Sequence, residues 1–215
     1  MAEGSIMIGA IIGDIVGSVY EFDNIKTKNF PFFGPRPNAN PNYSDNGRPT
    51  GECFFTDDTV LTIAVADWLL AGKDDLADRL AHYTFTYPNR GYGGMYANWA
   101  NAWDRQPYNS YGNGSAMRVS PVAWFAKNQG QVLELAKASA AVTHDHPEGI
   151  KGAQATALAI YMARTGEGAD RIRRSIADFA AYDLTETVDE IREWYYFNET
   201  CQKTVPQAII CALEA

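Results

Sequence analysis

The segment 56–70 constrains the fold of this chain most, because it is apolar on nearly every face and yet opens with two adjacent aspartates. Thr56 predicts a helix N-cap, and Asp57 and Asp58 in the first turn suit the positive end of the helix dipole. A helix that is hydrophobic all round is buried, so we expect this one to be central. Burying carboxylates at the N-terminus of such a helix costs free energy unless a cation such as Mg²⁺ compensates their charge. The alternative interpretation is a simple acidic cap.

Length and charge narrow the class of protein. A chain of 215 residues that is 46% hydrophobic predicts one globular domain over residues 1–215, and the net charge of −8 argues against a nucleic-acid partner. The apolar N-terminal stretch lacks a basic leader and is interrupted by Asp14, and no later stretch reaches membrane-spanning length, so we expect a soluble protein with no membrane partner. Cys53, Cys201 and Cys211 are odd in number and lack metal-ligand spacing, which fits free thiols in a reducing cytoplasm.

Helical periodicity dominates the chain and strand signals are scarce, which predicts an all-α fold. The predicted helices, besides the one that follows Thr56, cover 6–22, 76–87, 95–103, 131–143, 149–164, 169–181, 185–197 and 205–213. In the first of them, Asp14, Ser18 and Glu21 share one face, and glycines at positions 9, 13 and 17 would admit another helix. Irregular segments concentrate before residue 121, including a long loop over 28–53, and function usually lies in such loops.

Two glycine-rich loops and a histidine pair are candidate binding elements. Glycines flank Asn113 just before an expected helix start at Ser115, which indicates either a phosphate cradle or a tight turn with a serine cap. The loop 90–94 pairs a permissive backbone with Tyr92, whose ring could stack on a base. His144 and His146 are too few for a zinc site and predict either a substrate contact or a local cap, whereas His82 is interpreted as structural.

The order of these blocks is more specific than any one of them. The chain carries Gly13-Asp14-x-x-Gly17-x-x-x-Glu21, Thr56-Asp57-Asp58-Thr59, Arg90-Gly91-Tyr92-Gly93, Ser110-Tyr111-Gly112-Asn113-Gly114-Ser115-Ala116-Met117-Arg118 and Thr143-His144, in that order. This series resembles the ADP-ribosylglycohydrolase family, which includes the enzyme that reactivates dinitrogenase reductase and hydrolases that remove ADP-ribose from protein side chains. The resemblance runs from about Met7 to the C-terminus, and the block 110–118 is its most specific part.

The resemblance implies a compact, single-domain, orthogonal helical bundle with long functional loops and a cleft for two Mg²⁺ (or Mn²⁺) ions. It implies metal ligation by Thr56, Asp57 and Asp58, with Glu21 on a gating loop beside the metals and one of the three acids acting as base. The implied substrate is ADP-ribose on a protein side chain or small conjugate, hydrolysed through an oxocarbenium-like transition state. The substrate-binding residues that it implies are Gly91, Tyr92, Gly93, Ser110, Tyr111, Gly112, Asn113 and His144.

One motif of the family is missing. No D-x-D-T/S occurs before the chain stops at Ala215, and Asp74 and Asp75 are expected to form an exposed cap to the next helix rather than to replace it. From sequence we expect a domain truncated at its C-terminus, with the second ion weakly held, apolar surface open to self-association, and low or no hydrolase activity. The alternatives are a noncatalytic ADP-ribose-binding module and a purely structural helical protein.

Overall fold

The computed structural model describes residues 8–22, 25–33 and 52–215. These residues form eleven helices and no strand beyond an isolated bridge between Gly112 and Thr200, which confirms the all-α prediction. The helices are α1 (Ile8–Gly17), α2 (Asp57–Leu70), α3 (Leu76–Thr86), α4 (Gly94–Asn101), α5 (Gly114–Met117), α6 (Ser120–Phe125), α7 (Gln129–Ala141), α8 (Pro147–Arg164), α9 (Ala169–Ala180), α10 (Val188–Trp194) and α11 (Cys201–Glu214).

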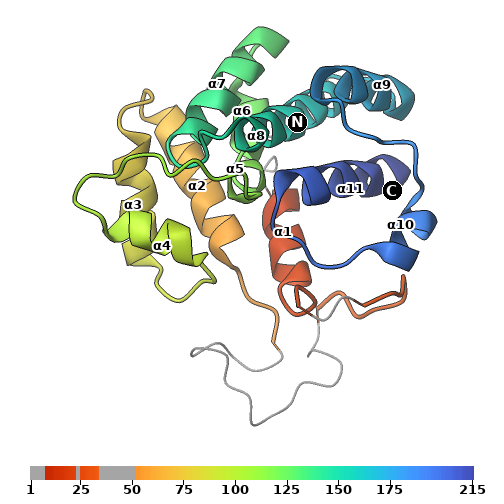
Figure 1. Cartoon of the computed structure of the whole chain (residues 1–215), viewed down its shortest axis with the longest axis horizontal. Helices are drawn as coiled ribbons and strands as arrows, with labels where there is room; N and C mark the ends of the chain where they lie inside the picture. Colours follow the sequence, from red (N-terminus) through yellow and green to blue (C-terminus); the bar gives the residue numbers. More distant parts are fainter. Residues whose placement is uncertain (1–7, 23–24, 34–51) are drawn as a thin grey trace.

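Helix α2 is central, as its apolar surface predicted. It packs against α1, α3, α5 and α6, so that helices from before and after it in the chain meet along it (Figure 1). Leu61, Ala64 and Val65 are almost completely buried in this packing. The Thr56 N-cap is also confirmed, because its side chain accepts a hydrogen bond from the backbone N–H of Asp58 at 3.2 Å.

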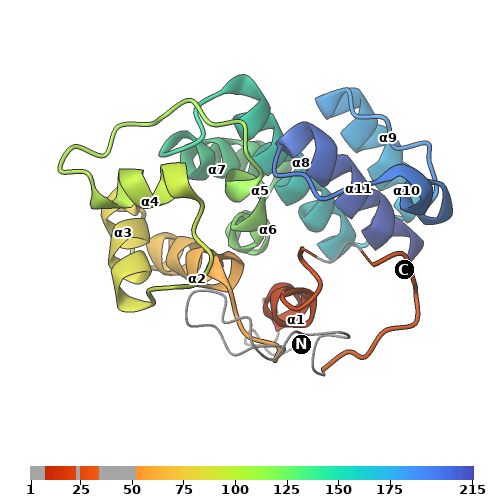
Figure 2. The same ribbon diagram turned by 60° about the horizontal axis from the view of Figure 1, so that its bottom comes forward.

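Helix α8 is the second organising element. It contacts α5, α6, α7, α9 and α11, and Figure 2 shows it running behind α11 with α7 and α9 on either side. Small residues allow this close packing, since Gly152, Ala153, Ala155 and Ala157 are all buried. At Gly152 the approach of α11 is closest: an added Cβ would lie 2.4 Å from Sγ of Cys201.

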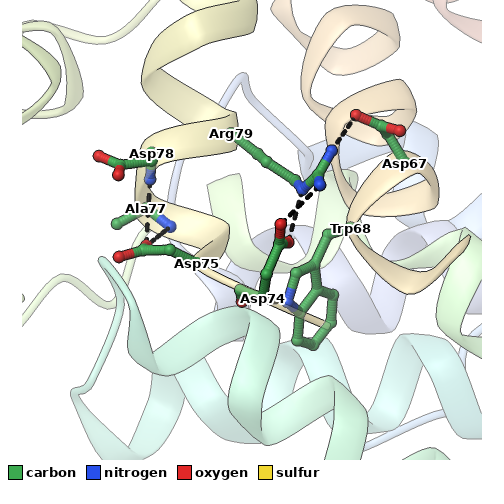
Figure 3. Close-up of polar contacts among 7 residues, drawn as sticks. All are labelled: Asp67, Trp68, Asp74, Asp75, Ala77, Asp78 and Arg79. Atoms are coloured by element: carbon green, nitrogen blue, oxygen red, sulfur yellow. Dashed lines mark hydrogen bonds and ion pairs between the residues drawn. The ribbon is translucent and has the colours of Figure 1, made fainter. Parts of the chain in front are cut away.

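A polar cluster fixes the turn between α2 and α3 (Figure 3). The side chain of Asp75 accepts hydrogen bonds from the backbone N–H groups of Ala77 and Asp78, which confirms its predicted role as the cap of α3. Asp74 accepts two hydrogen bonds from the Arg79 guanidinium, each 2.7 Å long, and Arg79 also pairs with Asp67. The second Asp-Asp pair is therefore structural.

The predicted boundaries were least accurate at the helix ends. α1 ends at Gly17, and residues 18–22 form a turn, so Glu21 lies beyond the helix on which it was expected. The three glycines of α1 meet nothing within 4 Å among the described residues, so no described helix makes the close approach that these glycines would allow. The six-residue helix α6 was missed because it is shorter than the periodicity that sequence reading needs.

The starts of two later helices differ from the predicted ones, and one predicted loop can be compared with the structure only in part. α10 starts at Val188 because Thr187 and Glu190 form a capping box, and α11 begins four residues before the predicted start. Of the predicted loop 28–53, residues 34–51 lie outside the described residues. No helix among the described residues is long and apolar enough to cross a membrane.

The packing at Gly152 gives a stability prediction. Alanine normally stabilises a helix interior by about 0.5–1 kcal/mol relative to glycine. Gly152→Ala should instead destabilise the protein by about 1–3 kcal/mol, because the new Cβ would overlap Cys201 of α11. Gly13→Ala, which meets nothing within 4 Å, is the matched control and should be neutral or stabilising. Urea denaturation measures both, and equal stability of the two variants would contradict the close packing.

Candidate active site

A cavity of about 500 Å³ opens where the N-terminus of α2 meets the two glycine-rich loops. It brings together nine of the predicted site residues from five separate parts of the chain. These nine are Glu21, Asp57, Asp58, Gly91, Gly93, Ser110, Gly112, Asn113 and His144. The volume falls in the range of small-molecule sites.

An adjoining cavity of about 360 Å³ lies on the α1 side of the acids. Asp14, Ser18 and Thr56 line it, and Glu21 and Asp58 line both cavities. Asp14, Ser18 and Glu21 therefore do face one space, as the sequence predicted, although α1 stops before Glu21. The acids stand at the boundary between the two cavities.

Two predicted residues lie elsewhere. The Tyr92 hydroxyl donates to the carbonyl of Tyr87 at 2.8 Å and its ring stacks on Tyr96. This side chain therefore packs against the protein and holds loop 90–94 in place. Tyr111 is half exposed, and its ring contacts His146 rather than the cavity. Neither residue is among those that line the cavity. Their backbones remain part of the two loops.

Asp14 positions the acids, although sequence reasoning gave it no role in the site. Its carboxylate accepts four hydrogen bonds, from the backbone N–H and hydroxyl of Thr56 at 2.8 and 2.6 Å and from the same groups of Thr59 at 3.2 and 2.5 Å. These bonds satisfy donors at the helix N-terminus that have no intrahelical partner. Helix α1 is thereby tied to the start of α2. The Gly13-Asp14 block of the motif series was the only signal of this role.

The loop 90–94 is tied to the same helix end. The backbone N–H of Asp57 donates to the carbonyl of Arg90 at 2.8 Å, and the Arg90 guanidinium lies 3.8 Å from the centroid of the Phe55 ring. Gly91 has a φ of 98°, a conformation that favours glycine. Gly91 and Gly93 consequently line the cavity beside the acids without side chains in the way.

Burial and mutual repulsion perturb both aspartates. Burial raises the pKa of Asp57 well above its ordinary value, and the neighbouring charges of Asp58, Glu21 and Asp14 add to this rise. Burial and the charge of Asp14 raise the pKa of Asp58 to about 6, against an opposing hydrogen bond from Thr56. Negative charge is thus concentrated here. Both pKa values are pushed in the direction that an added cation would reverse.

The donor chemistry fits a hard divalent cation in part. Two carboxylates and the Thr56 hydroxyl offer oxygen ligands, and Mg²⁺ often binds through one or two carboxylates while keeping its waters. Asp14 is already saturated by its four hydrogen bonds. Within the described ranges, no group of three or more His, Cys, Asp or Glu side chains is arranged to hold a metal ion. These residues therefore supply oxygen ligands to one side of an ion.

The loop 110–114 is braced by backbone hydrogen bonds from a distant segment. The N–H of Asn113 donates to the carbonyl of Glu199 at 2.7 Å, and the N–H of Cys201 donates to the carbonyl of Tyr111 at 3.0 Å. The N–H of Gly112 donates to Oγ of Ser110 at 3.1 Å. The amides of residues 112 and 113 are thus already used within the protein. Glu199 was missed because its carbonyl leaves no trace in a sequence pattern.

The structure bears differently on the two interpretations of the helix start at 113–115. The amides of Gly112 and Asn113 have internal hydrogen-bond partners, so the phosphate cradle stays a prediction that would not use these two groups. The predicted serine cap is wrong, because Ser115 is not a cap. Its hydroxyl is fully buried and donates to the carbonyl of Gly149 at 2.7 Å. Asn113 occupies the N-cap position without a side-chain capping hydrogen bond and lines the cavity. A ligand here would meet side chains of this loop rather than those two amides.

The two histidines of 144–146 divide the predicted roles between them. Nδ1 of His146 accepts a hydrogen bond from the N–H of Glu148 at 3.0 Å, which is the local cap at the start of α8. His144 is buried and lines the cavity. Burial, with the positive charge of Arg118, lowers the pKa of His144 to about 3, so its ring is neutral. His82 lies outside the cavity, on the exposed side of α3.

Comparison with known proteins assigns the chain to a family. A sequence profile of the ADP-ribosylglycohydrolase family matches residues 5–215. The chain is 32% identical over 179 residues to ADP-ribosylhydrolase ARH3 of Mus musculus and 31% identical over 180 residues to that of Homo sapiens. These matches cover 74% and 75% of this chain and 48% and 49% of the relatives, so the chain spans about half the length of the curated relatives it matches.

The fold is similar to a solved structure described as an ADP-ribosylglycohydrolase-related protein complex. The TM-score is 0.61 at 21% identity, and the match covers 97% of this chain and 72% of that one. Sequence profile, relatives and fold agree with the order of the motifs. This chain belongs to the ADP-ribosylglycohydrolase family.

The buried neutral histidine predicts a pH dependence of stability. Below its ordinary pKa of about 6.5 the unfolded chain binds a proton on His144 that the folded protein does not bind until about pH 3, so the free energy of unfolding falls as the pH drops through this window. From pH 7 to pH 5, wild type should lose about 2 kcal/mol more than His144→Gln. Urea denaturation at both pH values measures the difference. Equal losses would show that His144 titrates normally.

Proposed function

We propose that this chain is a metal-dependent hydrolase that cleaves the glycosidic bond between ADP-ribose and a protein side chain or small ADP-ribose conjugate. Membership of the family supports this function. The observation that carries it is the convergence of two half-buried acids, two glycine-rich loops and a neutral histidine on one cavity. The ribose end of the substrate is placed at Asp57 and Asp58, and the diphosphate end at loop 110–114 and His144.

The chemistry follows from the charge at the acid end. Water attacks the anomeric carbon, the bond from this carbon to the leaving nitrogen or oxygen breaks, and the leaving group gains a proton. Positive charge develops on the ribose in the transition state, and the carboxylates of Asp57, Asp58 and Glu21 stabilise it electrostatically. One of these three acids accepts the proton of the attacking water. Asp14 acts through Thr56 by fixing where the acid pair stands.

The proposed cofactor is Mg²⁺ or Mn²⁺ on Thr56, Asp57 and Asp58. When bound, such an ion orients the ribose hydroxyls and lowers the pKa of water. A cation also offsets the repulsion that raises the pKa of both aspartates. The cytoplasmic location, the absence of a nucleic-acid partner and self-association stay predictions from sequence.

A noncatalytic ADP-ribose-binding module is the second candidate function. The observation that favours it is that the described acids form no group of three arranged around an ion. Such a module would use loop 110–114, His144 and the glycines of loop 90–94, and would bind the ligand without metal.

Calorimetric titration with ADP-ribose distinguishes the two functions. For the metal-dependent hydrolase we expect binding in Mg²⁺ that weakens at least about tenfold in EDTA, which corresponds to about 1.4 kcal/mol. Equal affinity in Mg²⁺ and EDTA would favour the noncatalytic module. No binding under either condition would overturn both. Release of ADP-ribose from a modified protein then measures turnover directly.

Removing the acid pair should abolish the effect of the metal. In the variant Asp57→Asn/Asp58→Asn, affinity for ADP-ribose should be the same in Mg²⁺ and EDTA, because amides replace both charged ligands. Asp75→Asn is the matched control, since asparagine caps a helix as well as aspartate does. The control should keep the metal dependence of wild type. A metal effect that persists in the double variant would place the ion elsewhere.

A further inference from the structure

Among the described residues, Arg118 is the largest side chain that is fully buried, and it lies in the wall of the cavity. Its Nη2 donates to the carbonyl of Ser139 and to Oγ1 of Thr143, both at 2.8 Å. Its Nε and Nη1 have no hydrogen-bond partner in the structure, and burial lowers its pKa. A buried charge held only by a carbonyl and a hydroxyl is costly, so its presence calls for a role beyond packing.

The hydrogen bonds of Thr143 determine which ring nitrogen of His144 carries the proton. Oγ1 of Thr143 lies 2.6 Å from Nδ1 of His144. Because a guanidinium can only donate, Thr143 accepts from Arg118. Thr143 is fully buried, so its own O–H needs an acceptor, and the only one in its recorded contacts is Nδ1. Nδ1 is therefore unprotonated, and the neutral ring carries its proton on Nε2.

This Nε2–H is directed at the loop that faces the ligand. A Cβ added at Gly114 would lie 3.0 Å from Nε2, and one at Gly112 would lie 3.6 Å away. Glycine at position 114 therefore leaves room beside this nitrogen, whereas the distance at position 112 is an ordinary van der Waals contact. Among the recorded hydrogen bonds of the described residues, none involves Nε2. A donor of fixed direction thus lies next to the loop that carries Asn113, in the wall of the same cavity that the acids line.

We propose that Arg118, acting through Thr143, holds His144 as the Nε2–H tautomer, so that the diphosphate contact of His144 proposed above is made by this N–H. The second half presupposes the ADP-ribose binding proposed above, whereas the tautomer exists without ligand. Arg118 and Thr143 are positioning residues. The positive charge of Arg118 behind the ring favours an anionic acceptor over a neutral hydroxyl.

The pair Thr143→Val and Thr143→Ser tests the first half. Valine preserves the shape and removes the hydroxyl, and serine keeps the hydroxyl. Nitrogen-15 NMR of the imidazole at pH 7, without ligand, reports the tautomer. We expect Nε2–H in wild type and Thr143→Ser and a mixture in Thr143→Val. An Nδ1–H ring in wild type, or an unchanged ring in Thr143→Val, would overturn the proposal.

Affinity tests the second half with two ligands. Binding of ADP-ribose should weaken about tenfold in Thr143→Val and recover in Thr143→Ser. Binding of adenosine, which lacks phosphate, should be the same in all three proteins. Equal weakening for both ligands would overturn the phosphate contact. If wild type binds no ADP-ribose, the proposed function and the phosphate contact both fall, whereas the NMR result still decides the tautomer.

The role of Arg118 is tested by Arg118→Met, which keeps volume and removes the donor. We expect the same mixed tautomer as in Thr143→Val, because the Thr143 hydroxyl is no longer held. An unchanged Nε2–H ring in a folded Arg118→Met would show that Arg118 does not position His144. Ser139→Ala is the matched control, because Arg118 uses only the backbone carbonyl at that position. The His144 ring of this variant should have the same tautomer as in wild type. If Arg118→Met does not fold, the substitutions at Thr143 still decide the orientation of the ring.

Discussion

The carboxylate of Asp14 is the interaction on which the site depends. It accepts the hydrogen bonds of Thr56 and Thr59 at the first turn of α2, and so joins α1 to the helix that forms the centre of the core. The same first turn carries Asp57 and Asp58, and the backbone N–H of Asp57 is held by the carbonyl of Arg90. The carboxylate of Asp14 thus organises the N-terminus of α2, which carries the two further carboxylates of Asp57 and Asp58. The repulsion among these acids costs free energy, and burial of the apolar side chains of α2 on several sides offsets that cost.

Groups of opposite electrostatic character line the cavity. Acids cluster at the N-terminus of α2, where burial and mutual repulsion raise their pKa values. The buried Arg118 guanidinium and the neutral His144 line the same cavity, and the described contacts of Arg118 include no carboxylate. A ligand that joins a sugar to a diphosphate matches this division, because the sugar develops positive charge during cleavage and the phosphates are anionic.

Cooperation between distant segments keeps this arrangement rigid. Loop 110–114 is pinned by Glu199 and by Cys201, whose thiol donates to the carbonyl of Gly112 at 3.1 Å. Cys201 in turn packs against Gly152 in the middle of α8. The start of α11, the small-residue face of α8 and the ligand-facing loop therefore form one packed unit. Hydrogen-bonded loops of this kind hold a site in place before ligand arrives.

The sequence by itself determined the helical class, the central α2 with its Thr56 cap, the capping role of Asp75 and the family, because periodicity, capping and ordered motifs are local properties. It could not determine the anchoring role of Asp14, the use of the Gly112 and Asn113 amides, or the orientation of His144. These depend on partners up to 86 residues away, such as Glu199 for Asn113. Hydrogen bonds between segments far apart in the chain appear only when the helices pack, and they decided which groups face the cavity.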